Sequence, residues 1–304
     1  DPEDLKLAAE LARRADVLIE NFRPGTMERF GLDFEAVRKD NPGVVYCSIT
    51  GFGRGEGAAL PGYDPLVQAL SGLMSVTGPP DGEASKVGVA LVDVIAGLNA
   101  SNGILAALRV RDATGEGQRV EIDLLSTALS ALANQASSYL NTGVAPSRLG
   151  NVHPSIEPFS TYAAADGPMM ICAGNDRHFA SLAQVLGVPE LADDDRYASN
   201  GSRVENREAL RAEIEAQLAK RPVADWVEDL SFAGVPAGPV NDIEGGFDLA
   251  ESLGLDVVDE IDGIRIPASP IQLSEDPPEI RLAPPELDGQ GEMLRAWLAG
   301  PDLS

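Results

Sequence analysis

The chain has 304 residues, of which 44% are hydrophobic and 23% are charged, a composition typical of a soluble protein with one large domain or two ordinary ones. The formal net charge is −25, so nucleic acid and anionic membranes would be repelled and are not expected as partners. No run approaches the roughly 18 apolar residues of a membrane span. We expect a cytoplasmic protein.

The first fifty residues alternate between helical and strand-like patterns. Asp1-Pro2 predicts a helix start, since aspartate is a good N-cap and proline suits the first helical position. Strands are predicted at 16–20 and 44–50, with a helix at 33–40 between them. Helices that alternate with short apolar strands are typical of a parallel sheet. The sequence therefore predicts an α/β fold with a Rossmann-like large domain.

The large domain is expected to continue to residue 142. A glycine-rich loop at 51–62 precedes a predicted helix at 63–74. An apolar run at 87–110 contains a strand-to-helix change, and its small residues would allow close helix packing. A strand at 117–125 and a helix at 126–142 complete the predicted domain 1–142.

The composition changes at 143–158, which is rich in loop residues and predicts a linker. A smaller α+β domain is expected at 159–243, opening with a hairpin around Asp166-Gly167. Its helices are predicted at 176–187, 203–220 and 222–233. The remaining 244–304 has a strand-like segment at 260–267 and a final helix at 289–299. Because this tail has no core of its own, we expect it to pack back on the large domain.

Asp93 is the strongest candidate for chemistry, because it interrupts an apolar run. In one interpretation it is an N-cap that accepts hydrogen bonds from the first helical turn and stays ionised. In the other it is a carboxylate nucleophile at the carboxyl edge of a parallel sheet, where ligands tend to bind. The two are compatible, since nucleophilic attack requires the ionised form.

Two loops follow predicted strands and should meet at the same edge. Asn21 and Phe22 come directly after the first strand, and Arg29 stands where it could meet a phosphate. Gly51-Phe52-Gly53 takes the same position after the second strand. The Gly51–Gly53 loop does not have the pattern of a mononucleotide motif and is weak evidence for phosphate binding. A structural turn and the wall of a nucleotide or thioester site are both consistent with them.

Metal and disulfide chemistry have little support. Cys47 and Cys172 each lie in an apolar strand-like run, where a buried reduced thiol is the ordinary state. With His153 and His178 as the only histidines, a zinc site is not expected, and no metal ligand is assigned.

Six segments in order give the chain a family resemblance. They are VLIENFRPGTMERFGLDFEAV, VVYCSITGFGRGEG, GYDPLVQALSGLMSVTG, KVGVALVDVIAGLNASNGILAALRVRDATGEGQRVEIDLL, GNVHPSIEPFSTYAAADGPMMICAGND and AGVPAGPVNDI. Together they resemble the class III CoA-transferases, the family of formyl-CoA transferase and carnitine CoA-transferase.

The resemblance implies an acyl-CoA:carboxylate CoA-transferase with Asp93 as its catalytic residue. Asn21, Phe22 and Arg29 would line the coenzyme A site together with the Gly51–Gly53 loop, and Tyr63 the acyl pocket. Acyl-CoA and a carboxylic acid would be the substrates, with no tightly bound cofactor. Family members form interlocked homodimers. The resemblance also implies that about 70 residues, two βα units, precede residue 1.

Departures from the family pattern bear on the substrate. Pro61 replaces a basic residue of formyl-CoA transferase, and that enzyme's tetraglycine loop has no counterpart here. Both departures disfavour formyl or oxalyl substrates.

Two alternatives stay open. The superfamily includes α-methylacyl-CoA racemases, whose catalytic histidine falls at Tyr63, and a phenol with a pKa of about 10 is a poor base at neutral pH. His153 is interpreted as a loop residue rather than as a base. The other alternative is a protein that binds acyl-CoA without turnover.

Overall fold

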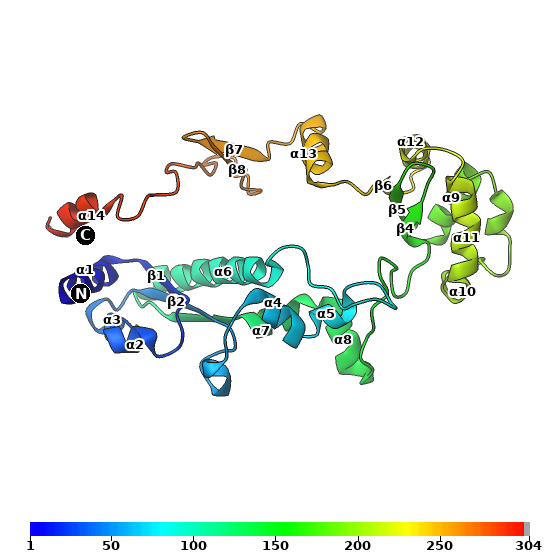
Figure 1. The fold of residues 1–304 in the computed structure, drawn as a ribbon. Helices are drawn as coiled ribbons and strands as arrows, with labels where there is room; N and C mark the ends of the chain where they lie inside the picture. Colours follow the sequence, from blue (N-terminus) through cyan, green and yellow to red (C-terminus); the bar gives the residue numbers. More distant parts are fainter. Residues whose placement is uncertain (301–304) are drawn as a thin grey trace. The chain divides into compact units, whose positions relative to one another are not determined.

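The computed structural model describes residues 1–300 (Figure 1). Contacts within the chain divide it into two compact units. Unit 1 consists of residues 1–150 together with the segment from Asp288 onward, and unit 2 of Asn151–Leu287. This division differs from the domain boundaries expected at residues 142, 158 and 243, which stay a prediction.

Unit 1 is built on the predicted parallel sheet. Its strands are β1 (Val17–Glu20), β2 (Val45–Thr50) and β3 (Arg119–Asp123), in that order across the sheet. The central strand β2 is the most buried of the three, and its first three residues are fully buried. A strand that is covered on both faces reads as a continuous apolar run, which explains the sequence pattern.

Unit 1 also contains eight α-helices between residues 1 and 150. They are α1 (Pro2–Arg14), α2 (Thr26–Phe30), α3 (Phe34–Asp40), α4 (Asp64–Leu70), α5 (Leu73–Val76), α6 (Leu91–Thr114), α7 (Leu124–Ala131) and α8 (Ala133–Thr142), with a 3₁₀ turn at Glu56–Ala59. Of these helices, α6 and α7 contact the sheet directly. As predicted, α1 begins at Pro2 with Asp1 as its N-cap. The helix expected over 63–74 is two helices, because Gly72 adopts a left-handed backbone with φ of 88°. The helix expected over 126–142 is likewise divided, at Ala133.

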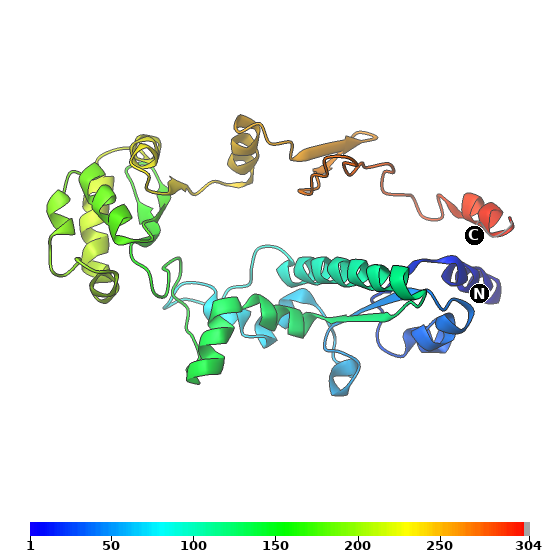
Figure 2. The same cartoon turned by 180° about the vertical axis from the view of Figure 1, so that it is seen from behind.

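The apolar run at 87–110 differs from its prediction. The segment directly before Asp93 is not a strand. Residues 84–90 have no regular structure, and α6 begins at Leu91. The small residues Ala96, Ala100 and Ala107 are buried, so that α6 lies close against β2 and β3 (Figures 1 and 2). By length and composition α6 could also cross a membrane, but core helices of soluble proteins pass the same test.

Unit 2 contains the smaller α+β domain. Its antiparallel sheet has β4 (Phe159–Ala163), β5 (Pro168–Cys172) and β6 (Ala237–Pro239), and the predicted hairpin joins the first two. Helices that pack on this sheet enclose one apolar core. They are α9 (Asp176–Val185), α10 (Asn200–Glu205), α11 (Arg207–Leu218) and α12 (Val223–Phe232), with a 3₁₀ turn at Pro189–Ala192.

The tail begins with α13 (Ile243–Ser252), a helix that the sequence did not predict. The expected single strand at 260–267 is a hairpin of β7 (Val258–Ile261) and β8 (Ile264–Pro267). Its turn residues, Asp262 and Gly263, both have positive φ, as tight hairpin turns require.

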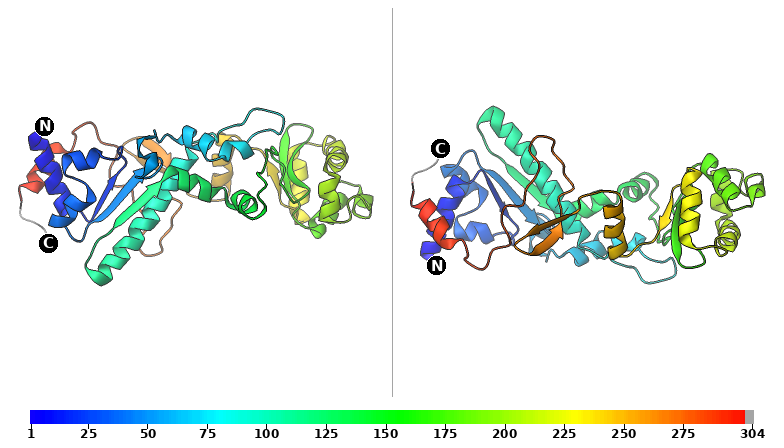
Figure 3. Two further views of the ribbon diagram at one scale, coloured as in Figure 1. Left: turned by 90° about the horizontal axis from the view of Figure 1, so that it is seen from below. Right: turned by 90° about the horizontal axis from the view of Figure 1, so that it is seen from above.

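The chain then returns to unit 1. The last helix, α14 (Gly291–Leu298), packs against α1 (Figures 2 and 3). Arg14 donates hydrogen bonds to the backbone carbonyls of Trp297 and Leu298, and its guanidinium lies 5.2 Å from the centre of the Trp297 ring. The expected return of the tail to the large domain is therefore present.

Candidate active site

A cavity of about 490 Å³ lies in unit 1, at the carboxyl ends of its three parallel strands. Asn21 and Phe22 line it directly after β1, Gly51 directly after β2, and Leu124 directly after β3. This edge is where ligands bind in open α/β sheets, because the loops that leave the strands converge there.

Five of the predicted site residues line this one cavity. They are Asn21, Phe22, Gly51, Tyr63 and Asp93. Their sequence positions span more than seventy residues, so the fold and not sequence proximity brings them together. Phe22 and Tyr63 are both more than half exposed, so that aromatic surface is available at the cavity wall.

Three other predicted residues do not line the cavity. Arg29 is exposed on α2, where its guanidinium donates a hydrogen bond to the Thr26 hydroxyl at 3.4 Å. Phe52 packs against the apolar cluster beneath the cavity. The N–H of Gly53 donates to the Thr50 hydroxyl. The assignment of these residues to coenzyme A binding stays a prediction.

The turn after β1 is held by a buried carboxylate. Glu20 is 7% exposed and accepts a hydrogen bond from the N–H of Phe22 at 3.0 Å. The turn also places Arg23 at the cavity, and it is the one cationic side chain among the lining residues. Arg23 forms no ion pair with any residue between 1 and 300. In a strongly acidic protein, such a cation marks the place where an anion can bind.

The glycine-rich loop after β2 returns to the cavity at Gly62. The backbones of Gly51 and Gly62 touch, and a Cβ atom on either would overlap the other residue. An ion pair between Arg54 of the loop and Glu28 of α2 attaches the loop to that helix. The loop thereby places Leu60, Pro61 and Tyr63 on the cavity wall.

Asp93 lies in the first turn of α6, with its side chain in the cavity wall. The N-cap interpretation is wrong, because the N-cap of α6 is Ala90. The Asp93 carboxylate accepts no hydrogen bond from the described part of the chain. Partial burial and the nearby charge of Asp64 raise the pKa of Asp93 above the usual value for an aspartate.

Asp64 was missed by the sequence analysis. It is 4% exposed, and its carboxylate accepts hydrogen bonds from the N–H groups of Val92 and Asp93. Asp64 therefore accepts the hydrogen bonds of the first turn of α6, the capping role that the sequence analysis considered for Asp93. The only signal was a single acidic residue between Tyr63 and Pro65, which ordinarily indicates the start of its own helix.

The thiols are poor alternatives as nucleophiles. Cys47 is buried in β2, and Cys172 is partly buried in β5. Burial raises the pKa of both thiols, so each favours its neutral form.

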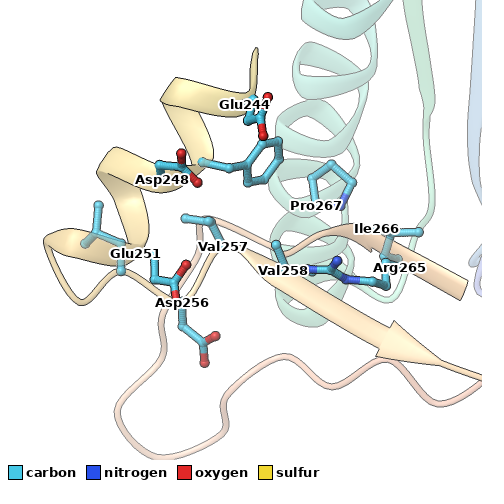
Figure 4. Close-up of a pocket in the computed structure, with 11 residues that line it drawn as sticks. Glu244, Asp248, Glu251, Asp256, Val257, Val258, Arg265, Ile266 and Pro267 are labelled. Carbon is cyan, nitrogen blue, oxygen red and sulfur yellow. The ribbon is translucent and has the colours of Figure 1, made fainter. Parts of the chain in front are cut away.

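A second cavity, of about 610 Å³, lies in unit 2 between α13 and the β7–β8 hairpin (Figure 4). It contains none of the predicted site residues. Its charged lining consists of Glu244, Asp248, Glu251 and Asp256, opposed by Arg265 alone. Although it is the larger cavity, its acidic walls suit an anionic thioester poorly.

Comparison with known proteins identifies the family to which this site belongs. The sequence profile described as CoA-transferase family III matches residues 1–291. The chain belongs to this family. It is thus an enzyme that transfers coenzyme A, and CoA thioesters are its substrates.

Several CoA-transferases are similar over nearly the whole chain. Acetyl-CoA:oxalate CoA-transferase of Acetobacter aceti is 40% identical over 305 residues, which cover 99% of this chain and 78% of that enzyme. Succinate–glutarate CoA-transferase of Agrobacterium fabrum is 41% identical over 301 residues, covering 96% of this chain and 75% of the relative.

Solved structures agree with the fold. A CAIB/BAIF family protein from Brucella suis superposes with a TM-score of 0.88 at 39% identity, over 98% of this CoA-transferase and 79% of that chain. Rv3272 from M. tuberculosis gives a TM-score of 0.87 at 28% identity, over 97% and 78% of the two chains. The Rossmann-like α/β fold with a smaller α+β domain is confirmed.

Proposed function

We propose that this CoA-transferase moves coenzyme A from an acyl-CoA to a free carboxylic acid and that Asp93 is the nucleophile. The observation that carries the proposal is the state of the Asp93 side chain. It is a carboxylate without a hydrogen-bond partner among residues 1–300, in the wall of a cavity at the carboxyl edge of the sheet. Such a group is accessible and keeps its lone pairs for attack.

The first half of the reaction loads the enzyme. A carboxylate oxygen of Asp93 attacks the thioester carbonyl of the donor, the C–S bond breaks, and an aspartyl–acyl anhydride and CoA thiolate form. The thiolate attacks the aspartyl carbonyl of the anhydride and displaces the donor acid as its carboxylate. An aspartyl–CoA thioester remains on the enzyme.

The second half mirrors the first. The acceptor carboxylate attacks the aspartyl thioester and displaces CoA thiolate, which gives a second anhydride. The thiolate then attacks the acyl carbonyl of the acceptor, releasing the new acyl-CoA and the Asp93 carboxylate. No proton is taken up or released overall. A carboxylate suits this role because its anhydride and its thioester are both reactive, so that no intermediate is a trap.

The acceptor is proposed to be a dicarboxylic acid. The names of the two relatives described above include oxalate, succinate and glutarate. Arg23 lines the same cavity as Asp93, and a guanidinium can bind the carboxylate that does not react. The expectation from Pro61 that oxalyl substrates are disfavoured gains no support from the oxalate-using relative.

We further propose that the enzyme is a homodimer. α6 exposes Val94, Leu98 and Leu105, which lie four and seven residues apart and so share one face of the helix. All three are more than half exposed in the single chain. An apolar stripe of this kind favours a protein partner.

The nucleophile is tested by intact mass. Wild-type enzyme incubated with acyl-CoA and no acceptor should gain the mass of CoA less one water, the signature of the aspartyl thioester. Asp93→Ala should gain no mass and should lose transfer, while Asp112→Ala, at an exposed aspartate of the same helix, should behave as wild type. Turnover above a few per cent in Asp93→Ala would place the nucleophile elsewhere.

A further inference from the structure

Asp64 lies directly behind the wall that carries Asp93. It is the first residue of α4, and only 4% of its surface is exposed. One carboxylate oxygen, Oδ1, accepts a hydrogen bond from Gln68 Nε2 at 2.6 Å. The other, Oδ2, accepts from the N–H groups of Val92 at 2.8 Å and Asp93 at 3.3 Å. A buried carboxylate thus links two helices that are far apart in the sequence.

The start of α6 depends on this link. Its N-cap, Ala90, has no side-chain acceptor for the N–H groups of the first turn. Aspartates elsewhere in unit 1 cap their own helices, as Asp33 does for α3 by accepting from Glu35 and Ala36 at 3.0 and 3.3 Å. The contacts made by Asp64 have nearly the same geometry, but the carboxylate comes from a different helix.

The N–H groups at the start of α6 are consequently all used. Asp64 takes those of Val92 and Asp93, and backbone carbonyls take those of Leu91 and Val94. A carboxylate in the first turn of a helix is ordinarily held and kept acidic by such N–H groups. Because Asp64 occupies them, the Asp93 carboxylate has none left to accept from.

We propose that Asp64 is a positioning residue for CoA transfer, which fixes the first turn of α6 so that the Asp93 carboxylate faces the cavity without a hydrogen bond. This inference rests on the proposed role of Asp93 as the nucleophile. Asp64 itself touches no substrate, since it is buried and does not line the cavity. It acts through the geometry and the charge that it presents to Asp93.

Gln68 holds Asp64 in place. It is fully buried one turn further along α4, and its Oε1 accepts the N–H of Val87 at 2.9 Å. The amide therefore joins the segment that leads into α6 to the carboxylate that caps α6. With both oxygens engaged, Asp64 cannot rotate to bind another group, which keeps the first turn of α6 in one arrangement.

The charge of Asp64 has a predictable effect on the pH profile. The titratable or charged side chains that face Asp93 are Arg23 and Tyr63 across the cavity and Asp64 behind it. Partial burial and, after it, the negative charge of Asp64 disfavour ionisation of Asp93 and so raise its pKa. Attack needs the ionised form, and activity is lost as the pH falls through this pKa. Removing the charge of Asp64 should move that acidic limb to lower pH.

Three variants separate geometry, charge and general stability. Asp64→Asn removes the charge and can place the NH₂ group of the new asparagine opposite the NH₂ group of Gln68, so that two donors face each other. The double variant Asp64→Asn with Gln68→Glu restores an acceptor for every donor, because the new glutamate accepts hydrogen bonds from the amide at position 64 and from the N–H of Val87. Its negative charge lies at position 68, one helical turn away from the original charge at position 64. Asp33→Asn is the matched control, a cap of the same geometry outside the cavity.

Asp64→Asn should lower kcat by about 10- to 100-fold with little change in KM for acyl-CoA, since misplacement of the reacting group by 1 Å can cost about 100-fold. The double variant should recover most of this loss while keeping its acidic limb at lower pH than wild type. Asp33→Asn should leave kcat and the pH profile unchanged. If Asp64→Asn does not fold, the double variant still provides the pH test.

A kcat for Asp64→Asn within twofold of wild type, with an unmoved acidic limb, would overturn the inference. So would an equal loss in Asp33→Asn. Either result leaves the mass test of Asp93 intact, so that a failure here is distinct from a failure of the proposed function. Conversely, a fully active Asp93→Ala would sink the proposed function whatever Asp64→Asn does.

Discussion

Gly51 and Gly62 close the neck of the glycine-rich loop by direct backbone contact. The first lies at the end of β2 and the second just before Tyr63, and both line the cavity. No residue with a side chain fits at either position, because its Cβ would overlap the opposing backbone. The contact therefore sets where Tyr63 stands relative to the end of β2.

Gly51→Ala should destabilise the chain and impair catalysis together. Forcing extra atoms into a packed site costs typically about 1–3 kcal/mol, and here the displaced neighbour is the backbone that leads to Tyr63. Gly88→Ala is the control, since its Cβ would meet no atom within 4 Å and its backbone is not left-handed. Urea unfolding and transfer kinetics measure both effects. Equal stability of the two variants would contradict the close contact.

Asp93→Asn should stabilise the fold at neutral and alkaline pH. The raised pKa of Asp93 means that ionisation is less favourable in the folded chain than in the unfolded one. Above the folded-state pKa this difference reduces stability, and it vanishes below the unfolded-state pKa, where both states are protonated. The melting temperature of the variant should exceed that of wild type at about pH 8 and converge with it in acid. A gap that widens as the pH falls would show the opposite sign.

Tyr63→Phe distinguishes CoA transfer from racemisation. If Tyr63 shapes the acyl pocket, losing its hydroxyl removes at most a hydrogen bond or two, each worth about 0.5–1.5 kcal/mol. Transfer should then fall roughly 2- to 13-fold, whereas loss of an essential acid or base costs about 10²–10⁴-fold. The measurement is transfer kinetics beside deuterium exchange of a 2-methylacyl-CoA in D₂O. Rapid exchange by wild type that disappears in the variant, without any transfer, would favour the racemase.

Arg203→Ala should severely destabilise unit 2. The side chain is fully buried and donates to the carbonyls of Glu157 and Tyr197 and to the carboxylate of Asp176. The Asp176 carboxylate is largely exposed, so the main cost is that the two carbonyls lose their buried donor, at about 1–3 kcal/mol for each group left without a partner. Arg196→Ala, which removes an exposed ion pair, should cost no more than about 1 kcal/mol. Comparable losses of the two variants in chemical denaturation would mean that the buried hydrogen bonds of Arg203 do not contribute to stability.

Leu105→Glu should weaken the proposed homodimer, because it places a charge within the apolar stripe of α6. Asn99→Glu, at an exposed polar position on the same helix but off that stripe, is the control. Sedimentation should show a dimer for wild type and for the control, and dissociation or aggregation for Leu105→Glu. A wild-type chain that sediments as a folded monomer at every concentration would rule out the assembly.

Local signals predicted most of the fold correctly. Asp1-Pro2 begins α1, and the apolar segments around Leu18 and Tyr46 are parallel strands, as predicted. Tyr46 lies in a run of four consecutive buried residues, which explains why its segment is apolar. The prediction of a strand just before α6 was wrong, since a short apolar run is equally compatible with a buried strand and a buried helix. The turn at Asp262-Gly263 carried a hairpin signal that the strand-like pattern around it obscured.

The site was predictable where residues follow strands and unpredictable where contacts are long-range. Asn21 and Gly51 could be placed because strand ends share one edge of a parallel sheet. The role of Asp64 could not be predicted, because its partners lie 28 and 29 residues away and no periodicity links them. A cap supplied by another helix has no local signature.

The clasp between α1 and α14 has a topological consequence. Residues 151–287 leave unit 1 and come back to it, and the contact of Arg14 with Trp297 and Leu298 closes the circuit. Unit 1 is thus closed by the contact of two short helices rather than by a covalent bond. Detachment of α14 would open this closure without melting the parallel sheet. The rate at which the closure opens would therefore be set by one small helix pair and not by the stability of the whole domain.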